Sequence, residues 1–146
     1  MKILSLDTST KILVLGLADN SGIYEYNLEV GRKLSSLLAS AIERSIKALG
    51  WQIKEIDYFA AGIGPGSFTG MRVGVATIKG LAWALKKPVV GISTLDVLAS
   101  NAAGKAKEIA VVVDASLLLD LVGCQAQGAL DAQRVQDGHV KLAPCL

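Results

Sequence analysis

The chain has 146 residues, of which 51% are hydrophobic and 19% charged, and its formal net charge is +2. This composition excludes a disordered chain and provides enough apolar residues for the core of one compact domain. The net charge is small, and the sequence has no basic run of the kind that binds nucleic acid unaided.

The first thirty residues predict three antiparallel strands in a meander. Residues 2–7 and 23–30 alternate apolar and polar side chains, and residues 11–18 form an apolar run between them. The turn signals Thr8-Ser9-Thr10 and Asp19-Asn20-Ser21-Gly22 separate these three segments.

The middle of the chain predicts strands that alternate with helices. The expected elements are a helix over 33–49, a strand over 58–63, a helix over 69–86, a strand over 88–92, a short helix over 94–101 and a strand over 109–113. Helical crossovers of this kind make neighbouring strands parallel. We therefore expect an α/β fold with a mixed five-stranded sheet, an antiparallel meander followed by βαβ crossovers, and helices on both faces.

The connection at residues 62–74 reads GIGPGSFTGMRVG and leads from a strand into the start of a helix. Glycines allow a close approach to the backbone, and the N–H groups at a helix start favour anions. An acid followed by hydroxyls, as in residues 7–10, can also hold a phosphate with magnesium, although a plain Asx or Ser/Thr turn explains the same residues. The nucleotide or phosphate candidates are Asp7, Thr8, Ser9, Thr10, Gly64, Gly66, Ser67, Thr69 and Arg72.

Small residues recur every four positions in the helix over 69–86. Gly70 and Gly74 form one such pair, and Ala76, Gly80 and Ala84 form a second series. A glycine inside a helix costs about 1 kcal/mol relative to alanine, so this spacing indicates close packing with another element. That element is either the sheet of this chain or a helix of a partner, and both interpretations can hold on different faces.

Catalytic chemistry finds little support in the sequence. His139 is the only histidine, so neither a serine hydrolase nor a multi-histidine metal site is expected, and no catalytic or metal residue is assigned. A magnesium ion held by Asp7 or Asp114 stays open, as does a turn-capping role for both acids. We expect a protein that is not itself an enzyme.

The last third of the chain has a different composition. Residues 117–122 fit a strand or a helix, and no structure is assigned to residues 125–140. Cys124 and Cys145 lack the spacing of a metal site. No disulfide framework is expected, which favours a reducing, cytoplasmic environment. No apolar run has the length of a membrane segment, so no membrane contact is expected.

The quoted motifs resemble one family. The L-D-T-S-T turn and GIGPGSFTGMRVG, followed by GLAWAL and GISTLDVLA, are similar to sequences of the TsaB/YeaZ family. The resemblance implies a ribonuclease-H-like lobe of the actin-like ATPase type. It covers residues 1–114, which we expect to form this N-terminal lobe, and leaves residues 115–146 as an atypical C-terminal tail.

The resemblance also implies a function. It implies a scaffold without catalytic activity that binds a TsaD-like transferase during tRNA threonylcarbamoyladenosine modification. A TsaE-like ATPase joins the complex, tRNA is reached only through the complex, and ATP with magnesium is possible there. Alone, the chain is expected to form a homodimer. Pairing would use the first two helices, and the implied interface residues are Leu34, Leu38, Ala41, Ile42, Gly70, Gly74, Thr77, Gly80, Leu81 and Ala84.

This chain departs from the family pattern in three places. Lys33-Leu34-Ser35-Ser36 stands where the family carries histidine, serine and glutamate, and Ser116-Leu117-Leu118-Leu119 stands where it carries arginine and other charged residues. The chain also ends before a second lobe, which indicates a truncated or frame-shifted C-terminus. The alternative function is a small ATPase or phosphotransferase of the same superfold, which would use Asp7 and residues 64–70.

Overall fold

The computed structural model describes residues 1–101, 108–114 and 119–126 of the chain. Two compact units are present, Met1–Thr94 and Leu95–Leu146. The boundary expected at residue 114 therefore falls inside the second unit. No helix in the described part of the chain combines the length and the apolar character that a membrane span requires.

The first unit contains five strands and two long helices, and each begins and ends within one residue of its expected limits. Its elements are β1 (Ile3–Asp7), β2 (Ile12–Ala18), β3 (Ile23–Glu29), η1 (Gly31–Lys33), α1 (Leu34–Ala48), η2 (Ile53–Glu55), β4 (Tyr58–Gly62), α2 (Phe68–Leu85) and β5 (Val89–Ile92). The periodicity of the apolar residues was therefore a sufficient signal for these elements.

The five strands form one mixed sheet in the order β3-β2-β1-β4-β5. The pairs β1–β2 and β2–β3 are antiparallel, whereas β1–β4 and β4–β5 are parallel. The predicted meander followed by crossovers is thus confirmed. The parallel pairs bring the carboxyl ends of β1, β4 and β5 to the same edge of the sheet.

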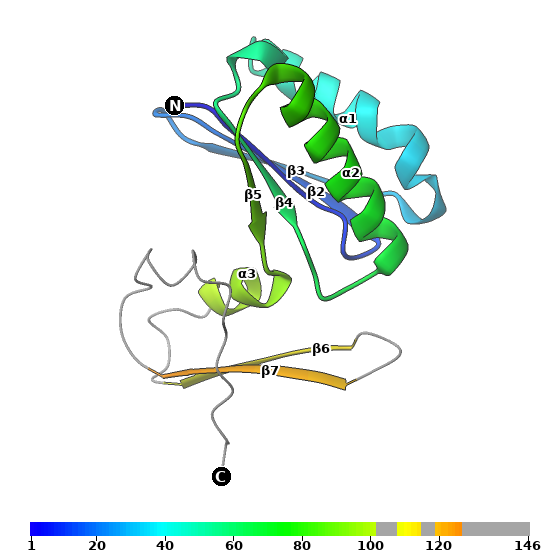
Figure 1. The fold of residues 1–146 in the computed structure, drawn as a ribbon, viewed down its shortest axis with the longest axis vertical. Coiled ribbons are helices and arrows are strands. Elements are labelled where there is room, and N and C mark those ends of the chain that lie inside the picture. Colours follow the sequence, from blue (N-terminus) through cyan, green and yellow to red (C-terminus); the bar gives the residue numbers. More distant parts are fainter. Residues whose placement is uncertain (102–107, 115–118, 127–146) are drawn as a thin grey trace. The chain divides into compact units, whose positions relative to one another are not determined.

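Both long helices cover the same face of this sheet (Figure 1). Strand residues of that face, such as Leu4, Leu15 and Phe59, share one buried cluster with Leu38 of α1 and Ile78 of α2. Right-handed crossovers that proceed in one direction along a sheet place their helices on one side, which accounts for the arrangement. A helix on the opposite face stays a prediction, because α3 (Thr94–Ser100) lies almost entirely in the second unit.

The second unit contains α3 and a two-stranded antiparallel sheet of β6 (Glu108–Asp114) and β7 (Leu119–Ala126). The strand expected over residues 109–113 is present, and its partner is β7 rather than a strand of the five-stranded sheet. The sequence left strand and helix open for residues 117–122, and the structure forms a strand over residues 119–126. Residues 127–146, which include His139 and Cys145, lie outside the described part.

Asp57 links the beginning of β1 to the beginning of β4. Its Oδ2 accepts a hydrogen bond of 2.8 Å from the Lys2 N–H, and its own N–H donates to the Lys2 carbonyl at 2.8 Å. Lys87 Nζ lies 3.8 Å from Asp57 Oδ1. The hydrogen bond from Lys2, followed by the charge of Lys87, lowers the pKa of the Asp57 carboxyl from its ordinary value of 3.8.

This lowered pKa predicts a pH-dependent effect of Asp57→Asn. The folded pKa lies below the unfolded one, so the carboxylate stabilises the fold above the unfolded pKa and this contribution is lost as pH falls through the folded pKa. We expect the variant to be less stable than the natural chain near pH 7, with the difference shrinking below about pH 4. Urea unfolding, monitored by circular dichroism, measures the stability of the two chains near pH 7 and at low pH. A difference for Asp57→Asn that is constant with pH would contradict the prediction.

Candidate functional site

The two motifs singled out by the sequence meet at the carboxyl edge of the sheet. The Ser67 N–H donates a hydrogen bond of 2.6 Å to the Ser9 carbonyl, and Thr8 Oγ1 donates one of 2.8 Å to the Gly70 carbonyl. The turn after β1 is thereby joined to the first turn of α2, about sixty residues later in the chain. We call this contact the turn–helix joint.

The glycines of α2's first turns are required by this joint. A Cβ atom at Gly70 would overlap the carbonyl oxygen of Thr8, and one at Gly74 would overlap the Thr8 hydroxyl. In the loop before the helix, a Cβ at Gly66 would lie 2.6 Å from Ser9 Cβ. These glycines therefore allow close packing within the chain itself.

Most polar groups of the joint already have partners in the chain. Ser67 Oγ accepts from the Gly70 N–H at 3.3 Å and caps α2, while Asp7 Oδ1 accepts from the Ser9 N–H at 2.6 Å. Asp7 Oδ2 lies 3.5 Å from Thr94 Oγ1, at the end of β5. The hydroxyl of Ser9 is the exception, because it is buried and has no hydrogen-bond partner in the described structure.

The remaining phosphate candidates divide into two groups. Gly64 is buried, and a Cβ there would overlap Met71 Sδ, so it belongs to the joint. Thr10, Thr69 and Arg72 are exposed, and Arg72 lies over the Phe68 ring with a separation of 5.4 Å. The structure thus places Gly64 in the packed joint and leaves Thr10, Thr69 and Arg72 on the surface. Among the described residues, no group of three His, Cys, Asp or Glu side chains could hold a metal ion.

Six of the ten expected interface residues need correction. They are buried in the chain and cannot contact a partner in this structure, because the strands and the joint cover them; they are Leu34, Leu38, Ala41, Ile42, Gly70 and Gly74. Thr77 and Leu81 are half-buried, and Thr77 Oγ1 donates to the Val73 carbonyl at 2.8 Å. Gly80 and Ala84 are exposed.

The exposed members of the second small-residue series define an outer surface of α2. Ala76, Gly80 and Ala84 are all exposed and stand four residues apart, so they form a continuous ridge. We call this the small-residue ridge. A Cβ built at Gly80 meets no atom within 4 Å, which makes it unlike Gly70 and Gly74. Ala76 was missed in the sequence-based list of interface residues, although its four-residue spacing was a usable signal.

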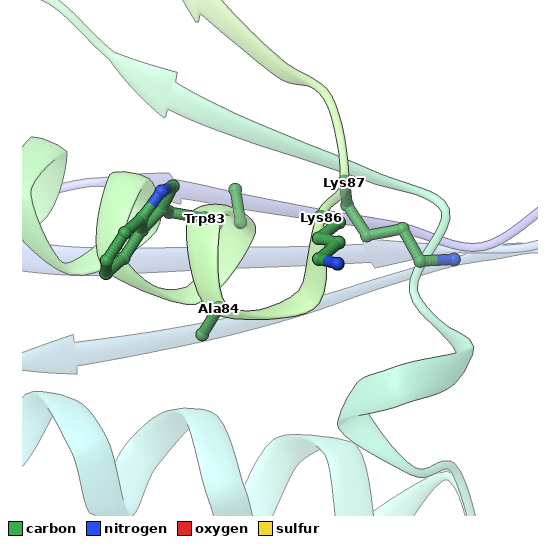
Figure 2. A pocket seen from close by; sticks show the side chains of 5 residues that line it. Trp83, Ala84, Lys86 and Lys87 are labelled. Atoms are coloured by element: carbon green, nitrogen blue, oxygen red, sulfur yellow. The ribbon is translucent and has the colours of Figure 1, made fainter.

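A shallow depression lies at the end of α2, lined by Ala82, Trp83, Ala84, Lys86 and Lys87. Figure 2 shows Ala84 and Trp83 pointing in different directions from the last turn of the helix. Trp83 is 86% exposed, and no sequence signal identified it in advance.

Comparison with known proteins identifies the family. Residues 28–117 match the family model described as TsaD, tRNA N6-adenosine threonylcarbamoyltransferase. The chain is 29% identical to the tRNA threonylcarbamoyladenosine biosynthesis protein TsaB of Escherichia coli, over 80% of this chain and 52% of that protein. It is 31% identical to TsaB of Bacillus subtilis, over 100% of this chain and 65% of that protein. The chain belongs to the TsaB/YeaZ family.

A solved structure of this family has the same fold. YeaZ from Pseudomonas aeruginosa superposes with a TM-score of 0.74 at 28% identity, covering 88% of this chain and 65% of that one. The chain therefore spans between half and two thirds of the length of these relatives. The predicted relation to the TsaB/YeaZ family and the predicted α/β fold with a mixed five-stranded sheet are confirmed.

The joint and the ridge predict opposite effects of the same substitution. We expect Gly70→Ala to lower the free energy of unfolding by roughly 1–3 kcal/mol or more, because the Thr8 carbonyl cannot move away from the new methyl group. Gly80→Ala should raise it by about 0.5–1 kcal/mol, because alanine favours the helix and meets open space. Urea unfolding of the two variants measures both changes. Equal effects at the two positions would contradict the assignment of the joint.

Proposed function

We propose that the chain is a scaffold subunit in tRNA threonylcarbamoyladenosine biosynthesis, without catalytic activity of its own, and that it binds a TsaD-like transferase. The names of the relatives support the pathway, since both TsaB proteins are biosynthesis proteins of this modification and the matching family model is the transferase itself. The proposed contact is the outer surface of α1 and α2, with the small-residue ridge at its centre. tRNA would be reached in the assembled complex.

Gly80 is the observation that carries this proposal. An exposed glycine inside a helix costs about 1 kcal/mol relative to alanine. Gly70 and Gly74 offset that cost by packing against Thr8, whereas a Cβ at Gly80 would meet no atom of the described residues within 4 Å. Together with Ala76 and Ala84, it provides a flat surface on which a partner's helix can approach the backbone closely.

The turn–helix joint supports a scaffold rather than a nucleotide enzyme. A phosphate site needs hydroxyl and N–H groups that are free to donate to the ligand. In this structure Thr8 Oγ1 already donates to the Gly70 carbonyl and the Ser67 N–H to the Ser9 carbonyl, while Ser67 Oγ accepts from the Gly70 N–H. ATP with magnesium, and a TsaE-like ATPase, are therefore proposed to act at the complex with the transferase, in the cytoplasm.

One observation favours the alternative, a small ATPase or phosphotransferase. Asp7 and Thr94 bring a carboxylate and a hydroxyl together at the carboxyl ends of β1 and β5, where α/β sheets collect ligands. Isothermal titration of the isolated chain with ATP and magnesium separates the two functions. Tight binding with turnover would favour the enzyme over the scaffold.

The scaffold proposal predicts that Gly80→Trp weakens binding to a TsaD-like transferase by about tenfold or more, a loss of roughly 1.4 kcal/mol. The indole would stand on the ridge and prevent close approach of the partner helix. Surface plasmon resonance with the immobilised transferase measures the affinity. Circular dichroism verifies that the variant is folded, which the open space at Gly80 favours.

Gly22→Trp is the matched control for this experiment. Gly22 also has no atom of the described residues within 4 Å of a built Cβ, but it lies in the turn between β2 and β3 and not on a helix. The Gly22→Trp variant should bind the transferase with unchanged affinity. Unaltered binding by Gly80→Trp, or equal loss with Gly22→Trp, would remove the ridge from the interface.

The same surface is proposed to pair two copies of the chain when no transferase is present. Exposed apolar surface on a helix tends to be covered by association. Light scattering of the natural chain across micromolar concentrations should then show a dimer that Gly80→Trp shifts towards monomer. A monomer throughout would contradict the dimer and leave the transferase experiment to decide the scaffold role.

A further inference from the structure

A second exposed surface of α2 adjoins the small-residue ridge. Phe68, Arg72, Lys79 and Trp83 are all exposed and follow one another at spacings of four, seven and four residues, which keeps them on one side of the helix. Lys86, the exposed residue that ends α2, continues the line. We call these five residues the cationic stripe.

The stripe has an excess of uncompensated positive charge. Within the described residues, the ion pairs involve Lys2, Lys47 and Lys87, and none involves a residue of the stripe. The sequence from Phe68 to Lys87 contains no aspartate or glutamate. An anionic partner would therefore meet three cations without having to break any ion pair in this part of the chain.

The stripe also exposes two aromatic rings. Phe68 is 70% exposed and Trp83 is 86% exposed, although large aromatic side chains are usually covered. The Arg72 guanidinium already lies over one face of the Phe68 ring, whereas Trp83 lies beside the depression at the end of the helix (Figure 2). Unoccupied aromatic faces between cations are the feature on which unpaired bases stack.

From these features we infer that the cationic stripe binds a single-stranded segment of RNA, with Arg72, Lys79 and Lys86 on phosphates and a base stacked on Trp83. This inference rests on the proposed function, since it gives the scaffold a direct contact with the RNA of the modification complex. Three phosphate contacts make a weak site, in keeping with a net charge of only +2. The site would therefore add to the affinity of the complex rather than replace the transferase's own contacts.

The experiment uses the whole chain alone and a fluorescein-labelled, unstructured oligoribonucleotide in a fluorescence anisotropy titration at several salt concentrations. Three phosphate contacts predict that log K falls with log salt with a slope of about −2. Lys79→Gln/Lys86→Gln should reduce that slope to about −0.7. Trp83→Ala should weaken binding roughly tenfold and leave the slope unchanged, because stacking releases no counterions.

The matched control is Lys11→Gln/Lys33→Gln, which removes the same charge from two exposed lysines outside the stripe. It should keep the slope of the natural chain. A polyglutamate peptide tests an acidic protein as the alternative occupant. Absence of saturable RNA binding at low salt, equal effects of the two double variants, or equal binding of polyglutamate that is insensitive to Trp83→Ala would each overturn the inference.

Failure of this inference is distinguishable from failure of the proposed function. The RNA titration contains no transferase and the transferase titration contains no RNA, so each experiment measures one interaction alone. Loss of RNA binding with an intact transferase complex would overturn the stripe alone. Loss of the transferase complex with RNA binding intact would overturn the scaffold role alone.

Discussion

The structure depends on the contact between the turn after β1 and the first turn of α2. β1 and β4 are parallel neighbours, so their carboxyl ends lie at the same edge of the sheet. Because α2 begins soon after β4, its first turn has to pass directly over the end of β1. Thr8 and Ser9 occupy that place, and only glycine at positions 66, 70 and 74 leaves room for them. The glycine-rich sequence is therefore a consequence of the topology.

The same constraint divides the small residues of α2 into two sets with different roles. From Gly74 to Ala76 the chain turns through two residues, about 200° around the helix axis, which moves from the buried side to the exposed side. Gly70 and Gly74 thus face Thr8, while Ala76, Gly80 and Ala84 face outwards. The two sets are separated when the angular position of each small residue around the helix axis is compared with those of the buried residues Ile78 and Ala82. The list of interface residues implied by the family resemblance included members of both sets, although the spacing alone left packing on the sheet open.

The pattern of apolar residues predicted the elements of the first unit because each element has one buried side. The periodicity that located α1 also marks which residues face the sheet, so Leu38 and Ile42 had to be core residues. The resemblance to a family indicated which helices meet a partner but not which side of them, and that is why these two were misassigned. The pairing of β6 with β7 was not predictable, because residues 117–122 carry no period that distinguishes strand from helix.

The charges of α2 differ from those that helix stability alone would select. An acid in the first turn of a helix is stabilised by the macrodipole, yet the first turn of α2 has none. A cation near the last turn is stabilised in the same way, and this accounts for Lys86 without any ligand. Arg72 and Lys79 lie too far from the C-terminal end of α2 to be stabilised by the macrodipole. Arg72 lies over the Phe68 ring within the helix, whereas the charge of Lys79 and the exposed ring of Trp83 on the same side are features that the proposed RNA contact would use.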